Sequence, residues 1–111
     1  MRKLNYELKW LCIANREGGH VTQASRKRIL MLIADQLHAL GFREMGVHSL
    51  RPKHVQRLVE VWTNGHEGFG WKPVSIGTLK NRLAQLRWWA GKANKAGVVA
   101  KSNAYYGIVP S

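Results

Sequence analysis

Apolar residues recur at the spacing of an α-helix in four separate stretches of the chain. In the first stretch they follow one another at i, i+4, i+7 and i+8: Leu4, Leu8, Leu11 and Cys12. This spacing places them on one face of a helix. The pattern fades at Asn15, and Gly18-Gly19 interrupts the chain. We therefore predict a first, short amphipathic helix.

The second stretch runs from about Thr22 to Leu40. One face of this predicted helix carries only apolar residues: Ile29, Leu30, Ile33, Leu37 and Leu40. Thr22 is suited to the N-cap, and Gly41 to the end of the helix. The opposite face carries Lys27, Arg28, Met31 and His38. The cluster Arg26-Lys27-Arg28 is thus expected to lie partly on the outside of the first turns.

The third stretch begins near Pro52, a residue well suited to the first turn of a helix. Apolar positions follow at i, i+3, i+4 and i+7: Val55, Leu58, Val59 and Trp62. Asn64-Gly65 ends the pattern. Arg51 then occupies the cap position, where Ser, Thr or Asp would serve better.

A glycine-rich loop, residues 65–73, leads into the fourth stretch, and we interpret it as a flexible connector. Ser75 is a good N-cap, and the predicted helix reaches about Ala93. Its apolar face consists of Ile76, Leu79, Leu83, Leu86 and Ala90. The free N–H groups at the start of this helix could alternatively hold a single phosphate.

Beyond Gly97 the helical pattern weakens, and Val98-Val99-Ala100 with Tyr105-Tyr106 indicates an extended tail. No stretch alternates apolar and polar residues with the period of a β-strand. The predicted fold class is therefore all-α, a compact four-helix bundle with an extended C-terminal tail.

Charge changes the picture, because 18 Lys and Arg stand against 6 Asp and Glu in 111 residues, a formal net charge of +12. The acids all precede Gly68, and the rest of the chain has only basic charges: Lys72, Lys80, Arg82, Arg87, Lys92, Lys95 and Lys101. Such self-repulsion destabilises a folded domain, so a polyanionic partner is the simplest explanation. Nucleic acid is the favoured partner. An anionic membrane, an acidic protein or solubility alone are the alternatives.

Few other kinds of chemistry are compatible with the sequence. The single cysteine, Cys12, excludes an internal disulfide and fits a reducing cytosol. The five histidines form no HExxH pair, and neither a GxSxG elbow nor a P-loop is present. No apolar run approaches the roughly 18 to 20 residues of a membrane span. We expect no cofactor, no metal, no membrane association and no enzyme activity of this chain on its own.

The polar side of the fourth helix is the most informative surface. Lys80 and Arg87 lie along one margin of its apolar face, and Thr78 and Arg82 lie along the other. Asn81 is near the back. Ammonium, guanidinium and amide groups can reach phosphates and base edges in a major groove. A solvated face without a partner is the alternative.

Several strings resemble those of a known family. They are Leu50-Arg51-Pro52-Lys53-His54-Val55-Gln56, then Trp62, the run from Ser75 to Leu83 (SIGTLKNRL), and the run from Leu86 to Ala90 (LRWWA). They resemble the N-terminal SAM-like core-binding domain of phage-type integrases, which are tyrosine recombinases. The resemblance extends from about Leu4 to Ile108.

This resemblance implies a helical domain that binds one face of a recombination half-site, while a separate catalytic domain closes from the other side. Its second and fourth helices would approach the major groove. The DNA contacts it implies are Ser25, Lys27, Arg28, Thr78, Lys80, Asn81, Arg82 and Arg87. Residues 1–97 would form the DNA-binding domain, and residues 98–111 the linker toward a catalytic domain that this chain lacks.

The family's catalytic arginines, His-x-x-Arg motif and nucleophilic tyrosine belong to that further domain, so neither Tyr105 nor Tyr106 is taken as a nucleophile. We expect sequence-specific binding of double-stranded DNA in the cytoplasm, at the bacterial nucleoid when bound, in service of DNA integration by a mobile element. The parent integrase would oligomerise on DNA, and the isolated domain would be monomeric. A stand-alone RNA-binding module and a protein-interaction module are the alternatives.

Overall fold

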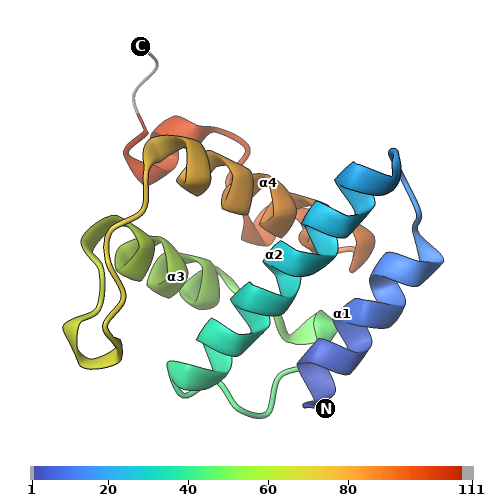
Figure 1. Cartoon of the computed structure of the whole chain (residues 1–111), viewed down its shortest axis with the longest axis horizontal. Helices are drawn as coiled ribbons and strands as arrows, with labels where there is room; N and C mark the ends of the chain where they lie inside the picture. Colours follow the sequence, from blue (N-terminus) through green and yellow to red (C-terminus); the bar gives the residue numbers. More distant parts are fainter. Residues whose placement is uncertain (1, 109–111) are drawn as a thin grey trace. The chain divides into compact units, whose positions relative to one another are not determined.

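A computed structural model describes residues 2–108, and within that range it contains helices and one isolated β-bridge but no β-strand. The α-helices are α1 (Lys3–Ala14), α2 (His20–Ala39), α3 (Pro52–Asn64) and α4 (Ile76–Lys92) (Figure 1). Short 3-10 turns are η1 (Val47–Ser49), η2 (Glu67–Phe69), η3 (Ala96–Val98) and η4 (Asn103–Tyr106). The all-α prediction is confirmed. The chain divides into two compact units, Met1–Leu50 and Arg51–Ser111, which are described in turn.

In the first unit α1 and α2 pack side by side and run in opposite directions (Figure 1). Their predicted apolar faces are largely buried: Leu4, Leu8, Ile29, Leu30, Ile33 and Leu37. Polar contacts tie the unit together as well. Asn5 Nδ2 donates to Asp35 Oδ1 at 3.1 Å, and the Val47 N–H donates to Glu7 Oε1 at 2.8 Å. α1 is thereby bonded both to α2 and to the segment that follows α2.

The predicted N-cap of α2 is wrong. The helix begins at His20 with Gly19 as its N-cap, and Thr22 lies inside the first turn. Gly18 has a φ of +87°, a conformation that residues with a Cβ rarely adopt. The chain therefore reverses earlier than capping preferences alone suggest. The end of α2 agrees with the prediction, because Gly41 at φ +101° directly follows the cap residue Leu40.

In the second unit α3 begins at Pro52 and ends at Asn64, as predicted. Arg51 is its N-cap but makes no side-chain cap; instead the Arg51 N–H donates to Nδ1 of His54 at 2.9 Å. At α4 the predicted cap is confirmed, since Ser75 Oγ accepts a hydrogen bond from the Thr78 N–H at 3.2 Å.

The predicted apolar face of α4 is buried at four of its five positions: Leu79, Leu83, Leu86 and Ala90. Ile76 is the exception, because 59% of it is exposed. A helical side chain tilts toward the helix N-terminus, so that of the first residue, Ile76, points past the end of the helix. Trp89, which the spacing analysis left out of this face, is fully buried.

The loop at residues 65–73 is more ordered than a flexible connector. His66 and Trp71 form an antiparallel bridge, and His66 Nδ1 accepts a hydrogen bond from the Phe69 N–H at 3.2 Å. The His66 and Phe69 rings stack with centroids 4.4 Å apart, and the Phe69 and Trp71 centroids lie 4.8 Å apart. Gly65 has a φ of +77°, and a Cβ there would lie 2.7 Å from the Trp71 carbonyl oxygen. Glycine is therefore required at the base of this turn.

From Val98 to Ile108 the chain is not the extended tail that the sequence predicts; residues 109–111 of that predicted tail lie outside the described residues. The described part contains the end of η3 and all of η4, and Val99 and Ile108 are buried. Arg87 on α4 donates from Nε to the Ala100 carbonyl at 2.9 Å, and the Ala100 N–H donates to the Tyr106 hydroxyl at 2.8 Å. Both are polar contacts, so hydrophobic periodicity does not predict them.

Candidate nucleic-acid interface

The basic cluster at the start of α2 divides between the surface and the interior. Lys27 and Arg28 are exposed, and Ser25 is half-buried. Arg26 is buried, and its Nη1 donates to the Glu17 carbonyl at 3.0 Å. Of the three consecutive cations, Arg26 therefore serves the internal structure of the first unit, while its two neighbours face the solvent.

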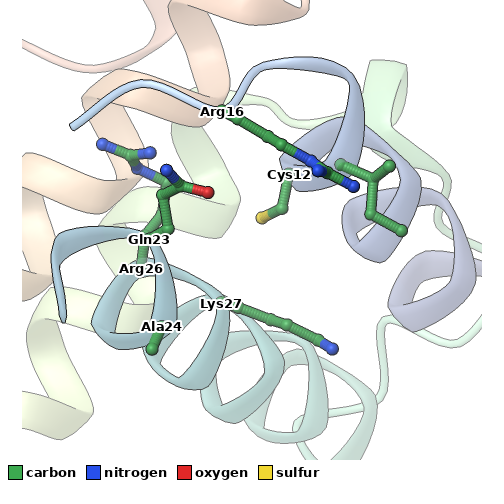
Figure 2. Close-up of a pocket in the computed structure, with 7 residues that line it drawn as sticks. Cys12, Arg16, Gln23, Ala24, Arg26 and Lys27 are labelled. Carbon is green, nitrogen blue, oxygen red and sulfur yellow. The ribbon is translucent and has the colours of Figure 1, made fainter. Parts of the chain in front are cut away.

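Lys27 and Arg26 also border a cleft between α1 and α2, which has a volume of about 250 Å³. The residues that line it are Cys12, Ile13, Arg16, Gln23, Ala24, Arg26 and Lys27. Figure 2 shows the Cys12 thiol pointing from α1 into the space between the helices, with the Arg16 side chain beside it and the Lys27 side chain across that space. The cleft thus combines a small apolar floor with three cations and no carboxylate.

The Cys12 thiol adds no negative charge to this cleft. Burial raises the pKa of Cys12, and the positive charges of Arg26 and Lys27 only partly oppose that effect. The thiol consequently stays protonated at neutral pH. The positive charges of Arg16 and Lys27 are therefore not offset by a thiolate when an anion approaches the cleft.

On α4 the predicted DNA-contacting residues differ in how firmly they are held. Lys80 is exposed. The Thr78 hydroxyl is 3.0 Å from Ser75 Oγ, and Asn81 Oδ1 accepts a hydrogen bond from Gln85 Nε2 at 3.4 Å. Lys80 and Asn81 are thus surface groups, while Thr78 belongs to the helix cap.

Arg82 is half-buried rather than extended into solvent. Its guanidinium carbon lies 5.4 Å from the centroid of the Trp62 ring, within the range of a cation–π interaction. Trp62 itself is buried in α3. The ring therefore restricts the directions in which the Arg82 guanidinium can point.

Arg87 is directed at its own chain. Besides the bond from Nε to Ala100, its Nη1 donates to Asn103 Oδ1 at 2.8 Å. Two of its three guanidinium nitrogens are therefore occupied inside the second unit. Direct contact of Arg87 with DNA stays a prediction.

The structure thus groups the predicted residues by helix, with Ser25, Lys27 and Arg28 on α2 and the other five on α4. Sequence reasoning missed the cleft residues Arg16 and Gln23. A signal was present for Gln23, which precedes Lys27 by four positions and so shares a face of α2 with it. Arg16 lies beyond the end of α1 at Ala14, so helical spacing does not identify it.

In the part of the chain that the structure describes, no three His, Cys, Asp or Glu side chains lie close enough together to hold a metal ion. No helix within residues 2–108 combines the length and apolar character that crossing a membrane requires. The ion pairs Arg2–Asp35 and Arg57–Glu60 involve none of the predicted DNA-contacting residues.

No curated protein and no solved structure matches this chain. The family model described as "Phage integrase, N-terminal", in contrast, matches residues 1–96, which is most of the chain. The helical fold and the strings in α3 and α4 agree with that match. The chain belongs to the N-terminal domain family of phage integrases.

Proposed function

We propose that this chain binds double-stranded DNA sequence-specifically, as the core-binding domain of a site-specific tyrosine recombinase. One observation carries the proposal. Lys27 and Arg28 on α2 and Lys80 on α4 are exposed, and among residues 2–108 the structure gives none of them an acidic partner. Each unit thus presents cations on a helix, in a chain whose net charge is +12.

Phosphate neutralisation would supply most of the affinity. Each Lys or Arg that meets a phosphate releases condensed counterions, which makes binding steeply dependent on salt. Base readout would come from Asn81 and Arg82, since amide and guanidinium groups match the edges of adenine and guanine. Because Trp62 already restricts the Arg82 guanidinium, less conformational entropy would be lost when it binds.

Strand cleavage and rejoining would belong to a separate catalytic domain of the integrase, and residues 98–111 would lead toward it. We assign no catalytic residue, metal or cofactor to this chain. The isolated domain would be monomeric, and the parent enzyme would oligomerise on its DNA site at the nucleoid.

Fluorescence anisotropy with a labelled DNA duplex, measured over a range of KCl concentrations, tests the proposal. With about five phosphates contacted, log K should fall against log salt with a slope of roughly −4 to −5. Lys27→Gln and Lys80→Gln should each reduce the slope by about one, since each removes one phosphate contact. Lys72→Gln, with the same change of charge at an exposed loop position, should have a smaller effect.

A slope near zero would contradict the proposal. Competition with an A-form RNA duplex of the same sequence separates the RNA-binding alternative. Equal or stronger competition by RNA would favour that alternative over a recombinase half-site.

A further inference from the structure

The folded-back C-terminal segment forms a cavity against α4 within the second unit. Its volume is about 200 Å³, and it is lined by Lys80, Ser102, Asn103, Ala104 and Ile108. Figure 1 shows this segment, in red, beside the first turns of α4. Lys80 belongs to the proposed DNA-binding residues, whereas the sequence suggests no function for Ser102 or Asn103.

The backbone carbonyls of the turn that borders the cavity are already used as acceptors. The Ser102 carbonyl accepts from the Tyr105 N–H at 3.3 Å, and the Asn103 carbonyl accepts from the Ile108 N–H at 3.2 Å. The Ala104 carbonyl accepts from the Gly107 N–H at 3.0 Å. Each of these oxygens therefore has one of its two lone pairs engaged within the turn.

The side-chain oxygens are engaged in the same way. Asn103 Oδ1 accepts from Arg87 Nη1 at 2.8 Å, and Ser102 Oγ accepts from the Ala104 N–H at 3.1 Å. As donors, these side chains offer the amide N–H₂ of Asn103 and the hydroxyl hydrogen of Ser102. Together with the ammonium group of Lys80, the polar groups that line the cavity are set up to donate.

Arg87 adds positive charge next to Asn103, one of the residues that line the cavity. Its guanidinium holds the Asn103 amide by the oxygen, which turns the nitrogen into the available group. Arg87 Nη2 is buried and has no hydrogen-bond partner among residues 2–108. No Asp or Glu follows Glu67 in the sequence, so neighbouring residues along this part of the chain bring no carboxylate to oppose the field.

We propose that this cavity binds a tetrahedral oxyanion, specifically a phosphate group, through Lys80, Ser102 and Asn103. The inference rests on the proposed function in one respect: in the complex the phosphate is one from the backbone of the DNA duplex. The segment that the sequence predicts to be a linker then forms part of the DNA-binding surface, and Arg87 acts there as a positioning residue.

¹H–¹⁵N NMR spectra of the 111-residue chain, recorded during titration with inorganic phosphate, test this proposal. Sodium chloride of equal ionic strength is the blank. Phosphate should shift the Asn103 side-chain amide and the backbone amides of residues 102–104 in a saturable manner. Lys80→Gln and Ser102→Ala should each weaken this binding roughly tenfold, the effect of losing a hydrogen bond to a charged group. Lys101→Gln, an equal change of charge at a residue that does not line the cavity, should leave these shifts in place.

Ser102→Thr keeps both the hydroxyl donor and the turn, so it controls for any loss of structure in Ser102→Ala. It should bind phosphate as the unsubstituted chain does. Shifts that fail to saturate, or shifts that are equal in Lys80→Gln, would overturn the proposal. The variants are compared in titrations with inorganic phosphate and without DNA. Failure of the phosphate-cavity proposal would therefore not affect the proposed function, which the salt dependence of duplex binding tests separately.

A second titration distinguishes the source of the phosphate. Adding a DNA duplex should displace inorganic phosphate and shift the same amides, and Ser102→Ala should weaken duplex binding without any change of charge. Retention of free phosphate at saturating duplex would overturn the assignment to the DNA backbone.

Discussion

Arg87 Nη1 lies 2.8 Å from Asn103 Oδ1, and this bond fastens the C-terminal segment to α4 across sixteen positions of sequence. An arginine on the polar side of a basic helix is typical of a DNA contact. Here it also fills an internal role, because its Nε holds the Ala100 carbonyl. One residue therefore links the stability of the segment to the shape of the proposed phosphate cavity.

Arg87→Ala should release the segment that follows Gly97. Both hydrogen bonds would be lost and their acceptors left without a partner, which costs roughly 1–3 kcal/mol of unfolding free energy. Urea unfolding followed by circular dichroism measures that loss. Arg28→Ala, at an exposed position of α2, should stay within about 0.5 kcal/mol of the unsubstituted chain. Unchanged stability of Arg87→Ala, with unchanged amide shifts at residues 100–108, would contradict this role.

His54 should make the protein less stable in acid. Burial first, and then the charges of Lys53, Arg51 and Lys95, lower the pKa of His54 to about 4. Protonation would also remove the Nδ1 acceptor that binds the Arg51 N–H. Since the pKa in the unfolded chain is near 6.5, the unfolded state binds more protons between these values. This contribution to stability is complete above pH 6.5 and is lost as the pH falls toward 4.

Urea unfolding at several pH values between 7.5 and 4 measures this dependence. His54→Gln, in which the amide oxygen can replace Nδ1 as acceptor, should flatten the curve over that window. His48→Gln changes an exposed histidine and provides the control. If the His54→Gln curve retained the full decline, another group would be responsible.

Cys12 offers a chemical probe of the cleft between α1 and α2. Its raised pKa and partial burial predict slow reaction with a maleimide at neutral pH, and faster reaction as the pH rises or urea is added. If DNA lies along Lys27, a bound duplex should slow the reaction further. Because the sequence has one cysteine, the rate of mass addition reports this site alone.

The protection should weaken in Lys27→Gln and persist in Lys72→Gln, both assayed at matched duplex occupancy. A labelling rate that is the same with and without duplex would show that DNA does not cover the α1–α2 cleft.

Substitution of Arg82 distinguishes base readout from phosphate contact. Arg82→Lys keeps the charge but loses the planar pair of donors, so it should cost roughly 1–3 kcal/mol for the preferred site if the guanidinium reads a guanine. Binding to an unrelated duplex should change little. Anisotropy titrations with the two duplexes measure the difference, and an equal loss on both would assign Arg82 to the backbone instead.

The sequence predicts local features of this fold well. The Ser75 cap, the start at Pro52 and the stop at Gly41 each depend on a few neighbouring residues, and all three are confirmed. The apolar faces follow for the same reason, since helical spacing alone determines which side chains share a side.

Features that depend on contacts between distant residues cannot be predicted from local sequence patterns. Trp62 beneath Arg82 and Asn103 beside Arg87 are tertiary contacts, and no period or motif connects these pairs. Arg26 shows the same limit at closer range: the sequence predicts that its cluster lies partly on the outside, and the bond to the Glu17 carbonyl shows that Arg26 is a buried member. Candidate binding residues are therefore predicted by type and helix, and the tertiary structure decides which of them remain available.

Contact between a DNA duplex and the cations on α2 and α4 is what the proposed function requires above all. Amide shift mapping during a duplex titration tests it most directly, with the complete chain and a DNA site of one half-site length. We expect the largest shifts around Lys27 and Arg28 and from Thr78 to Arg82, and we expect them to diminish as salt rises. Shifts confined to α1 and the 66–71 loop, with α2 and α4 unaffected, would contradict it.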